Sequence, residues 1–220
     1  LPGNIRNQLP NAAGQQGQWR GAQGTLGNLA TAYGVNVGRP APFSPAWYAQ
    51  HPNAWQIAQP YAGEAVVAAT ALGLASFMAI ESATLSGSDT IVVYGSEATA
   101  EETQAATELV QAGEATVDPN GQWMPIGAFA LRPMDAPNAT RMIHLAVDPQ
   151  GVLRGAHYDL LSEETTDIIG AVDRNTAQVS WRIGENGHVV FESTLAQLTQ
   201  PQGQVRVHFP DGQSGQWAVQ

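Results

Sequence analysis

The residues of this chain best suited to chemistry are carboxylates that crowd one stretch of the sequence. Glu163, Glu164 and Asp167 lie close together, with Asp159 and Asp173 nearby. Carboxylates and turn carbonyls are the ligands of calcium, so the first three residues form a candidate calcium site. Their spacing matches no dedicated calcium loop, and a solvated acidic loop is the interpretation that we favour. A glycosidase pair of acid and base would need the same residues, but nothing else in the sequence supports it.

Other reactive residue types form no recognisable motif. No two of the five histidines stand at a metal-ligand spacing on one element, and His144 and His208 are expected on the solvent faces of separate strands. Gly95-Ser96-Glu97 lacks the second glycine of a nucleophile elbow, and Ser96 is explained as a helix N-cap. We therefore expect no enzymatic activity, no catalytic residue and no cofactor.

Tryptophan offers a different chemistry, because its ring can stack on sugars. Trp19, Trp47, Trp55 and Trp123 are interleaved with proline, alanine and glycine. Exposed, they would suit a carbohydrate-binding module for surface polysaccharide. Buried, they would be core anchors, which is the interpretation we favour for tryptophans near helix starts.

Composition excludes several classes of protein. The 220 residues include no cysteine and no lysine, which removes disulfides, zinc–thiolate sites and Schiff-base chemistry. A net charge of −10 disfavours nucleic acid as a partner. The uncharged run between Glu64 and Glu81 has sixteen residues, whereas a membrane-spanning helix needs about 20, so we expect a buried or interface helix and no transmembrane segment.

Residues 1–42 differ from the rest of the chain. They contain eight Gly, five Gln and five Asn, and their apolar residues are scattered singly. Residues 1–63 carry three Arg and no acid, whereas residues 64–220 carry six Arg and all nineteen acids. We expect an extended arm that is ordered only by docking onto an acidic body, in the same chain or in another copy. Its assembly contacts would be Ile5, Leu9, Trp19, Leu26, Leu29, Tyr33, Val35 and Val37.

The remaining chain divides into a helical region and a β region. Over residues 43–113 we expect a helix beginning at Ser44-Pro45, an apolar helix over 65–80, a short strand over about 90–94 and a surface helix over 97–112. Residues 114–220 alternate apolar and polar side chains between turn signals, which predicts an antiparallel meander. The predicted fold is therefore α+β, with a curled sheet, barrel-like or sandwich-like, packed with helices and preceded by the arm.

Several segments resemble one group of proteins. They include residues 43–55 (FSPAWYAQHPNAW), 93–95 (VYG), 123–131 (WMPIGAFAL) and 208–213 (HFPDGQ). In this order they resemble a family of exported, putative cell-surface proteins of planctomycete bacteria, often labelled protocadherin-like. The resemblance covers roughly residues 43–219 and leaves the arm outside. It implies a secreted, cell-surface or extracellular location, reached after removal of a leader, and it implies no catalytic activity.

Together these patterns favour a structural protein of the cell surface or extracellular matrix. We expect it to self-assemble into a homo-oligomer or filament through residues 1–42, which would add hydrogen bonds to an exposed sheet edge of another copy. The alternative is a carbohydrate-binding surface module that uses exposed tryptophans. A small-molecule carrier built on the curled sheet is a further alternative.

Overall fold

A computed structural model describes residues 40–56, 70–81, 97–114, 117 and 121–220. The predicted arm, the predicted strand over 90–94 and Ser96 lie outside the described residues. The described helices are α2 (Pro45–Gln50), α3 (Ala71–Met78), α5 (Ala100–Ala112) and α6 (Leu195–Leu198). The strands are β1 (Met124–Pro133), β2 (Arg141–Val147), β3 (Val152–Asp159), β4 (Thr165–Val172), β5 (Gln178–Ile183), β6 (Val190–Thr194), β7 (Gly203–His208) and β8 (Ser214–Val219).

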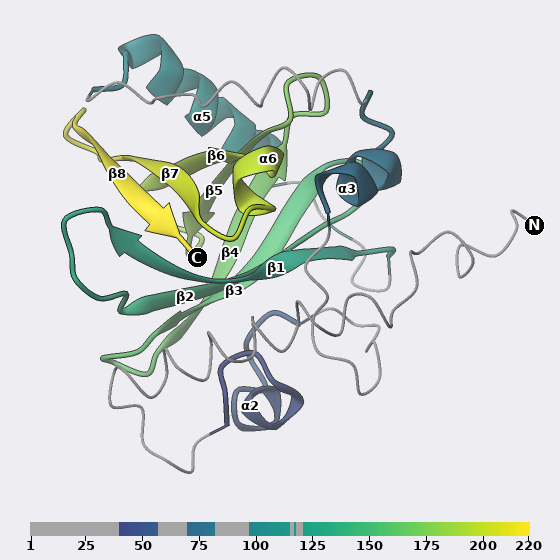
Figure 1. The fold of residues 1–220 in the computed structure, drawn as a ribbon, viewed down its shortest axis with the longest axis vertical. Helices are drawn as coiled ribbons and strands as arrows, with labels where there is room; N and C mark the ends of the chain where they lie inside the picture. Colours follow the sequence, from purple (N-terminus) through teal and green to yellow (C-terminus); the bar gives the residue numbers. More distant parts are fainter. Residues whose placement is uncertain (1–39, 57–69, 82–96, 115–116, 118–120) are drawn as a thin grey trace, which may run out of the picture.

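The eight strands form a closed antiparallel barrel in simple meander order (Figure 1). Each strand pairs with its neighbours in sequence, and β1 returns to pair with β8 through Leu131–Val219 and Pro133–Trp217. The predicted antiparallel sheet is confirmed, and it closes into a barrel. The described residues are mostly β, so α+β describes them only loosely, because the helices are short and lie on the barrel.

Closure matters for assembly, because a barrel has no edge strand for another chain to extend. One stretch of β1, residues 124–129, continues beyond the end of β8 and pairs with β2. It contains Pro125, and its register shifts between Pro125 and Gly127. Proline and bulges both hinder the addition of a strand. Within the described residues, closure of the barrel therefore leaves little of the exposed sheet edge expected from the sequence, and the part that remains is a poor template for strand addition.

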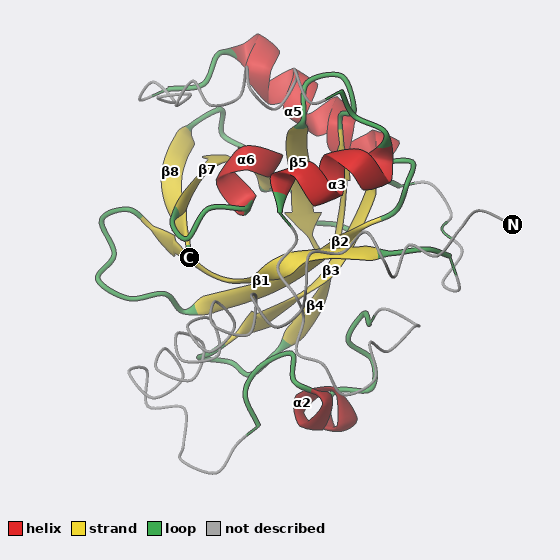
Figure 2. Cartoon of the chain, turned by 45° about the vertical axis from the view of Figure 1, so that its right-hand side comes forward, coloured by secondary structure: helices red, strands yellow, loops and turns green. Residues whose placement is uncertain are grey.

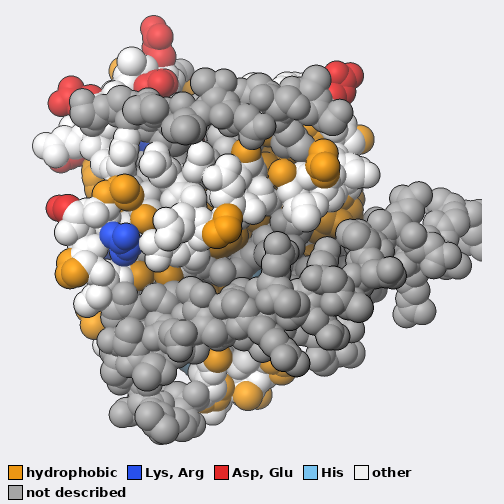
Figure 3. Space-filling model, viewed as in Figure 1, with side chains coloured by type: hydrophobic (Ala, Val, Ile, Leu, Met, Phe, Trp, Pro, Cys, Tyr) orange, Lys and Arg blue, Asp and Glu red, His pale blue; other side chains and the backbone are white. Residues whose placement is uncertain are grey.

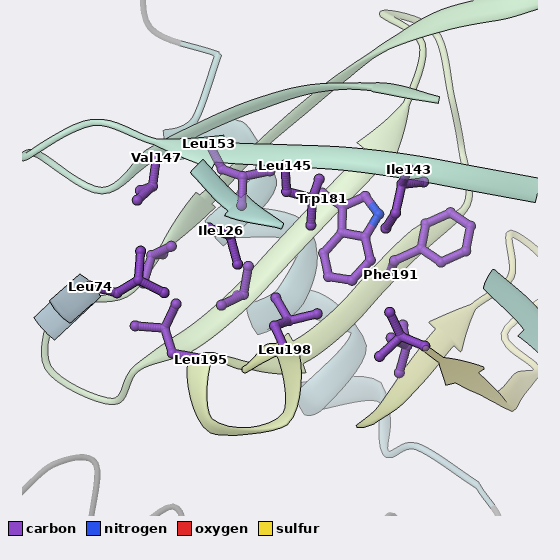
Figure 4. Close-up of a cluster of buried hydrophobic side chains, with 14 of the residues drawn as sticks. Leu74, Ile126, Ile143, Leu145, Val147, Leu153, Trp181, Phe191, Leu195 and Leu198 are labelled. Atoms are coloured by element: carbon purple, nitrogen blue, oxygen red, sulfur yellow. The ribbon is translucent and has the colours of Figure 1, made fainter. Parts of the chain in front are cut away.

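The barrel interior is a solid apolar core (Figure 4). Trp181 and Phe191 stack with their ring centroids 5.7 Å apart, and Ile143 and Leu145 pack beside them without exposure to solvent. The alternation on β5 and β7 is as predicted, with Val179, Val205 and Val207 inside. In Figure 2, α3 and α6 lie side by side across one end of the barrel. Leu74 and Leu195 from these helices join the interior core.

The apolar helix is shorter and less buried than expected. The described part of the predicted 65–80 helix is α3, which begins after the N-cap Thr70 and ends at Ala79 in the left-handed conformation. Leu74 and Met78 face the core, but Leu72 is 67% exposed, so the helix is not buried on all sides. In the described residues, no helix is both long and apolar enough to cross a membrane.

Two helices cover opposite sides of the barrel (Figures 1 and 2). Helix α2 begins, as predicted, with Ser44 as N-cap and Pro45 at its first position. Trp47 and Tyr48 pack on the outer face of β2 and β3, against Met142 and Tyr158. Helix α5 packs across β4, β5 and β6. His144 and His208 lie on outward faces as expected, but each is only 2% exposed because these helices cover them.

Candidate functional site

The candidate site is the outer surface of α5, because this helix presents a charged face on a rigid base. Residues 97–114 contain five Glu and no Arg. Glu101 and Glu108 are exposed, as are Gln104 and Gln111. Acidic side chains gather at the upper left of Figure 3, over the region of α5 in Figure 1. This face is therefore a negative surface within the described part of the chain.

An open groove of about 540 Å³ runs along α5. Its lining comes mostly from small or uncharged polar side chains of the helix, with one residue from the β7–β8 turn: Ala98, Ala100, Thr103, Gln104, Thr107, Glu108, Gln111 and Gly212. Threonines and glutamines donate and accept hydrogen bonds, and Glu108 adds a negative charge. The groove thus combines small apolar side chains with polar groups and one negative charge, which suits a segment of chain that carries arginine among small residues.

The first turn of α5 is fixed by a capping box. The Thr99 hydroxyl accepts a hydrogen bond from the Glu102 backbone N–H at 3.2 Å, and the Glu102 carboxylate accepts one from the Thr99 N–H at 2.8 Å. The bond from Thr99, and then the Arg206 guanidinium 3.1 Å away, hold the pKa of Glu102 below its usual range. The N-cap is Thr99 rather than the predicted Ser96, so the helix begins three residues later than expected.

A buried relay anchors the middle of the helix to the barrel. Thr103 Oγ1 lies 3.0 Å from His208 Nδ1, and His208 Nε2 lies 2.9 Å from Glu192 Oε2. Glu192 and His208 come from adjacent strands, β6 and β7. Sequence reasoning missed this group because its members are distant in the sequence. The only signal was the outward position of Glu192 and His208 on predicted strands.

A hydroxyl, an imidazole and a carboxylate in this order also make up hydrolytic triads. Here the Thr103 hydroxyl lies within 3.1 Å of the Thr99 carbonyl of its own helix. In both possible arrangements Nε2 of His208 donates to the Glu192 carboxylate. In the first, Nδ1 of His208 accepts a hydrogen bond from the Thr103 hydroxyl. In the second, Nδ1 carries a proton and donates to the Thr103 hydroxyl, which in turn donates to the Thr99 carbonyl. Every polar group has a partner in both cases, so the relay is a satisfied structural anchor for α5.

The end of α5 is held by a close backbone approach and two arginines. A Cβ added to Gly113 would lie 1.9 Å from the Gly170 carbonyl oxygen, so glycine is required where the helix meets β4. Arg154 donates to the Gly113 carbonyl at 2.7 Å, and Arg182 binds Glu114 at 2.6 Å. Ala106 and Val110 pack on Val190 between the two ends. The helix is therefore fixed along its length.

The structure does not bring the predicted calcium ligands together as a site. Glu163 and Glu164 are exposed, and Asp167 accepts a hydrogen bond from the Trp55 backbone N–H at 3.1 Å. The Asp159 carboxylate accepts from the Leu161 and Ser162 backbone N–H groups, which shape the same loop. Within the described ranges, no three acidic, histidine or cysteine side chains gather as a metal site.

The tryptophans are mainly core residues. Trp47 is 2% exposed and Trp123 is 8% exposed, which confirms both as anchors. Trp55 is half-buried, with its ring edge-on to Trp123 at 5.2 Å between centroids. Trp217, also half-buried, is covered by the Arg141 guanidinium at 5.2 Å. Trp19 and the other arm residues lie outside the described part of the chain.

A second buried polar group lies beneath α2. The Tyr48 hydroxyl is 2.9 Å from His144 Nδ1, within a cluster that includes Phe43 and Trp47. Burial raises the pKa of Tyr48 and lowers that of His144 to about 4, so both are neutral near pH 7. Phe43 has φ of 63°, a conformation that is unusual for a bulky residue. The role of this group is aromatic packing that fastens residues 43–54 to the barrel.

A second hollow, of about 700 Å³, lies near the end of α3 and includes Glu81, Asp173 and Arg174. The Asp173 carboxylate accepts hydrogen bonds from the Asn175 N–H and the Thr176 hydroxyl. These bonds shape the β4–β5 turn, so Asp173 has a structural role. The acidic groove on α5 remains the better candidate for contact with a partner.

Comparison with known proteins gives no match: no family model fits the chain, and neither a curated protein nor a solved structure is significantly similar to it.

Proposed function

We propose that this protein is a non-enzymatic structural protein of the cell surface or extracellular matrix. Copies of the chain assemble into a homo-oligomer or filament, and residues 1–42 of one copy dock on the body of the next. The barrel is the rigid body of each copy, and the arm connects it to the barrel of the next copy. The exported location follows from the resemblance of residues 43–219 to cell-surface proteins.

The division of charge along the chain carries this proposal. Residues 1–63 have three Arg and no acid, and every one of the nineteen acids follows them. Opposite charges on separate parts of a chain attract, within one molecule or between two. The arm is also poor in apolar residues, so it gains order only by contact with another surface. A negative body is such a surface.

The packing of the barrel supports a mechanical role for the body. Eight-stranded barrels either hold one small ligand or are filled by their own side chains. In this barrel Trp181, Phe191 and Ile143 are among the interior residues that are at most 2% exposed. A filled interior favours a rigid module over the alternative of a small-molecule carrier.

Closure of the barrel changes how the arm would dock. Strand addition needs a free sheet edge, and the barrel provides none along a whole strand. We therefore propose docking through side chains on the outer surface. Calcium is not needed for such a contact, although the Glu163–Asp167 loop could bind it weakly through exposed carboxylates.

Sedimentation velocity of the full chain and of residues 43–220 tests the proposal. We expect the full chain to form oligomers that grow with concentration, and the shorter chain to stay monomeric with the circular dichroism of a folded barrel. Equal assembly of both chains would contradict arm-mediated assembly. A monomeric full chain at all concentrations would contradict self-assembly altogether.

The second candidate, carbohydrate binding, depends on one observation. Trp55 is half-buried beside Trp123, so part of its indole is exposed to solvent and could contact a sugar. Retention on surface polysaccharide that is lost in Trp55→Ala, but kept in the Leu161→Ala control, would favour this function. Leu161 is a suitable control because it is 79% exposed.

A further inference from the structure

We propose that the groove on α5 is the docking site for the arm of a second copy of this chain. This inference rests on the proposed function and names the surface that assembly uses. The occupant is the segment 1–39, which carries Arg6, Arg20 and Arg39. Its partners are the exposed carboxylates and amides of α5.

Charge complementarity is the first argument. Glu108 lines the groove and accepts a hydrogen bond from the Gln104 amide at 2.8 Å, and Glu101 is exposed on the same helix outside the lining. No basic residue lies between residues 97 and 114. Glu102 already pairs with Arg206, and Glu114 with Arg182, so these two are partly neutralised. Glu101 and Glu108 keep their charge toward solvent and can receive arginines from the arm.

Polar complementarity is the second argument. Beside Ala98, Ala100 and Gly212, the groove lining includes the polar residues Thr103, Gln104, Thr107 and Gln111. The Thr107 hydroxyl donates to the Thr103 carbonyl and the Gln104 amide donates to Glu108, so the arm would use their remaining hydrogen-bonding positions and those of Gln111. The arm supplies five Gln, five Asn and eight Gly, a composition that can follow a helix surface closely and hydrogen-bond with it. The singly scattered apolar residues of the arm, which the sequence predicts as its assembly contacts, would meet the small side chains Ala98 and Ala100 of the lining.

The rigidity of α5 is the third argument. The capping box at Thr99, the Thr103–His208 bond and the Gly113–Gly170 contact fix this helix at its start, middle and end. A fixed surface loses little conformational entropy when a partner binds. The ordering cost then falls mainly on the arm.

The positions of the two helices make docking on a second copy a head-to-tail contact. The arm joins the described chain at Pro40, just before α2, which Phe43 and Trp47 fasten to β2 and β3. Figures 1 and 2 show α2 and α5 on opposite sides of the barrel. A contact from one side of a molecule to the opposite side of the next is head-to-tail. Repeated contacts of this kind do not close on themselves unless the rotation permits it, and so produce a filament.

A charge exchange between two full-length variants tests this docking. The arm variant carries Arg6→Glu, Arg20→Glu and Arg39→Glu, and the groove variant carries Glu101→Arg and Glu108→Arg. Glu102 is left intact so that the capping box remains. The control variant, Asp135→Arg with Glu164→Arg, makes the same change in net charge as the groove variant at exposed loop positions.

We expect each of the first two variants alone to assemble about tenfold or more weakly than the natural chain, because several attractive pairs become repulsive. Mixed together they should assemble again, because each arm then meets a groove of opposite charge. The control should assemble like the natural chain. Circular dichroism of every variant checks that the barrel is folded.

Three results would overturn the inference, and they have different meanings. If the arm variant is impaired but the groove variant is not, the arm docks elsewhere. If both are impaired and mixing restores nothing, the arm does not reach the groove of another copy. If the control is impaired as strongly as the groove variant, only overall charge matters. Equal assembly of the full chain and of residues 43–220 would instead refute the proposed function itself.

Discussion

His208 Nε2 lies 2.9 Å from Glu192 Oε2 beneath α5, and both side chains are less than a tenth exposed. A buried carboxylate without a partner is costly, so this pair explains why His208 is tolerated on the outer face of a strand. The same histidine contacts Thr103, which connects the barrel to the helix. The pair therefore supports the surface that we propose for docking.

Replacing His208 by Leu should reduce the free energy of unfolding by about 3–5 kcal/mol, because Glu192 is left buried without a partner. The double variant His208→Leu with Glu192→Leu should recover much of this loss, since no buried charge remains. Urea unfolding measures both. If the double variant loses as much unfolding free energy as the two single variants together, the pair is not coupled. A separate test is incubation with a hydroxyl-directed fluorophosphonate: covalent labelling of Thr103 would contradict its structural role.

Gly113→Ala should destabilise the protein by about 1–3 kcal/mol, because the added methyl group collides with the Gly170 carbonyl and forces α5 away from β4. A suitable control is Gly215→Ala, whose added carbon would meet its nearest neighbour at an ordinary 3.4 Å. Thermal unfolding compares the two variants. A Gly113→Ala protein as stable as the natural chain would show that this contact does not fix the helix.

Stability should fall in acid between about pH 6.5 and pH 4. Burial lowers the pKa of His144 to about 4, and burial and then Arg141 lower that of His157 to about 4. Unfolded histidine has a pKa near 6.5, so the unfolded chain binds more protons within this window. The free energy of unfolding is therefore at its full value above pH 6.5. It decreases as the pH falls from 6.5 through 4, and each histidine accounts for a loss of about 3 kcal/mol.

His144→Gln should therefore flatten the decline of unfolding free energy between pH 6.5 and 4, even if it lowers the stability at neutral pH. His188→Gln is the control, because His188 is exposed. Urea titrations at several pH values give the slopes. An unchanged slope in His144→Gln would mean that this histidine is not held neutral in the fold.

Calcium should have little effect on stability. Glu163 and Glu164 are exposed, and the Asp167 carboxylate accepts a hydrogen bond from the Trp55 backbone N–H. We expect the melting temperature in millimolar calcium to equal that in a chelator. A saturable rise that disappears in Glu163→Gln with Glu164→Gln would establish the calcium site that the sequence pattern indicated.

The sequence predicts the β part of this fold well, because local alternation and turn residues determine antiparallel hairpins. Val179, Trp181 and Ile183 share one face of a predicted strand. In the structure Val179 and Trp181 belong to the interior core, and Ile183 is partly buried against it. Closure into a barrel could not be predicted, because the β1–β8 pairing joins residues at opposite ends of the domain. No local pattern near Leu131 or Val219 specifies that partner.

The candidate site was harder to predict for the same reason. The acidic character of residues 97–114 is visible in the sequence, but the anchors of α5 come from distant strands. His208 is expected from the sequence on a solvent face, but it contacts Thr103 of a helix about a hundred residues earlier, and Arg206 pairs with Glu102 of the same helix. Gly113 likewise gives no sequence signal of its contact with Gly170.

The central claim is that residues 1–42 dock on another copy, and energy transfer between labelled populations tests it most directly. The chain has no cysteine, so Ala12→Cys in the arm and Ala105→Cys on the exposed face of α5 each provide one labelling site. Arm-labelled donor protein is mixed with α5-labelled acceptor protein. The account predicts transfer between the two populations that grows with concentration and is lost in high salt. Transfer found only within doubly labelled single chains, and never between populations, would contradict it.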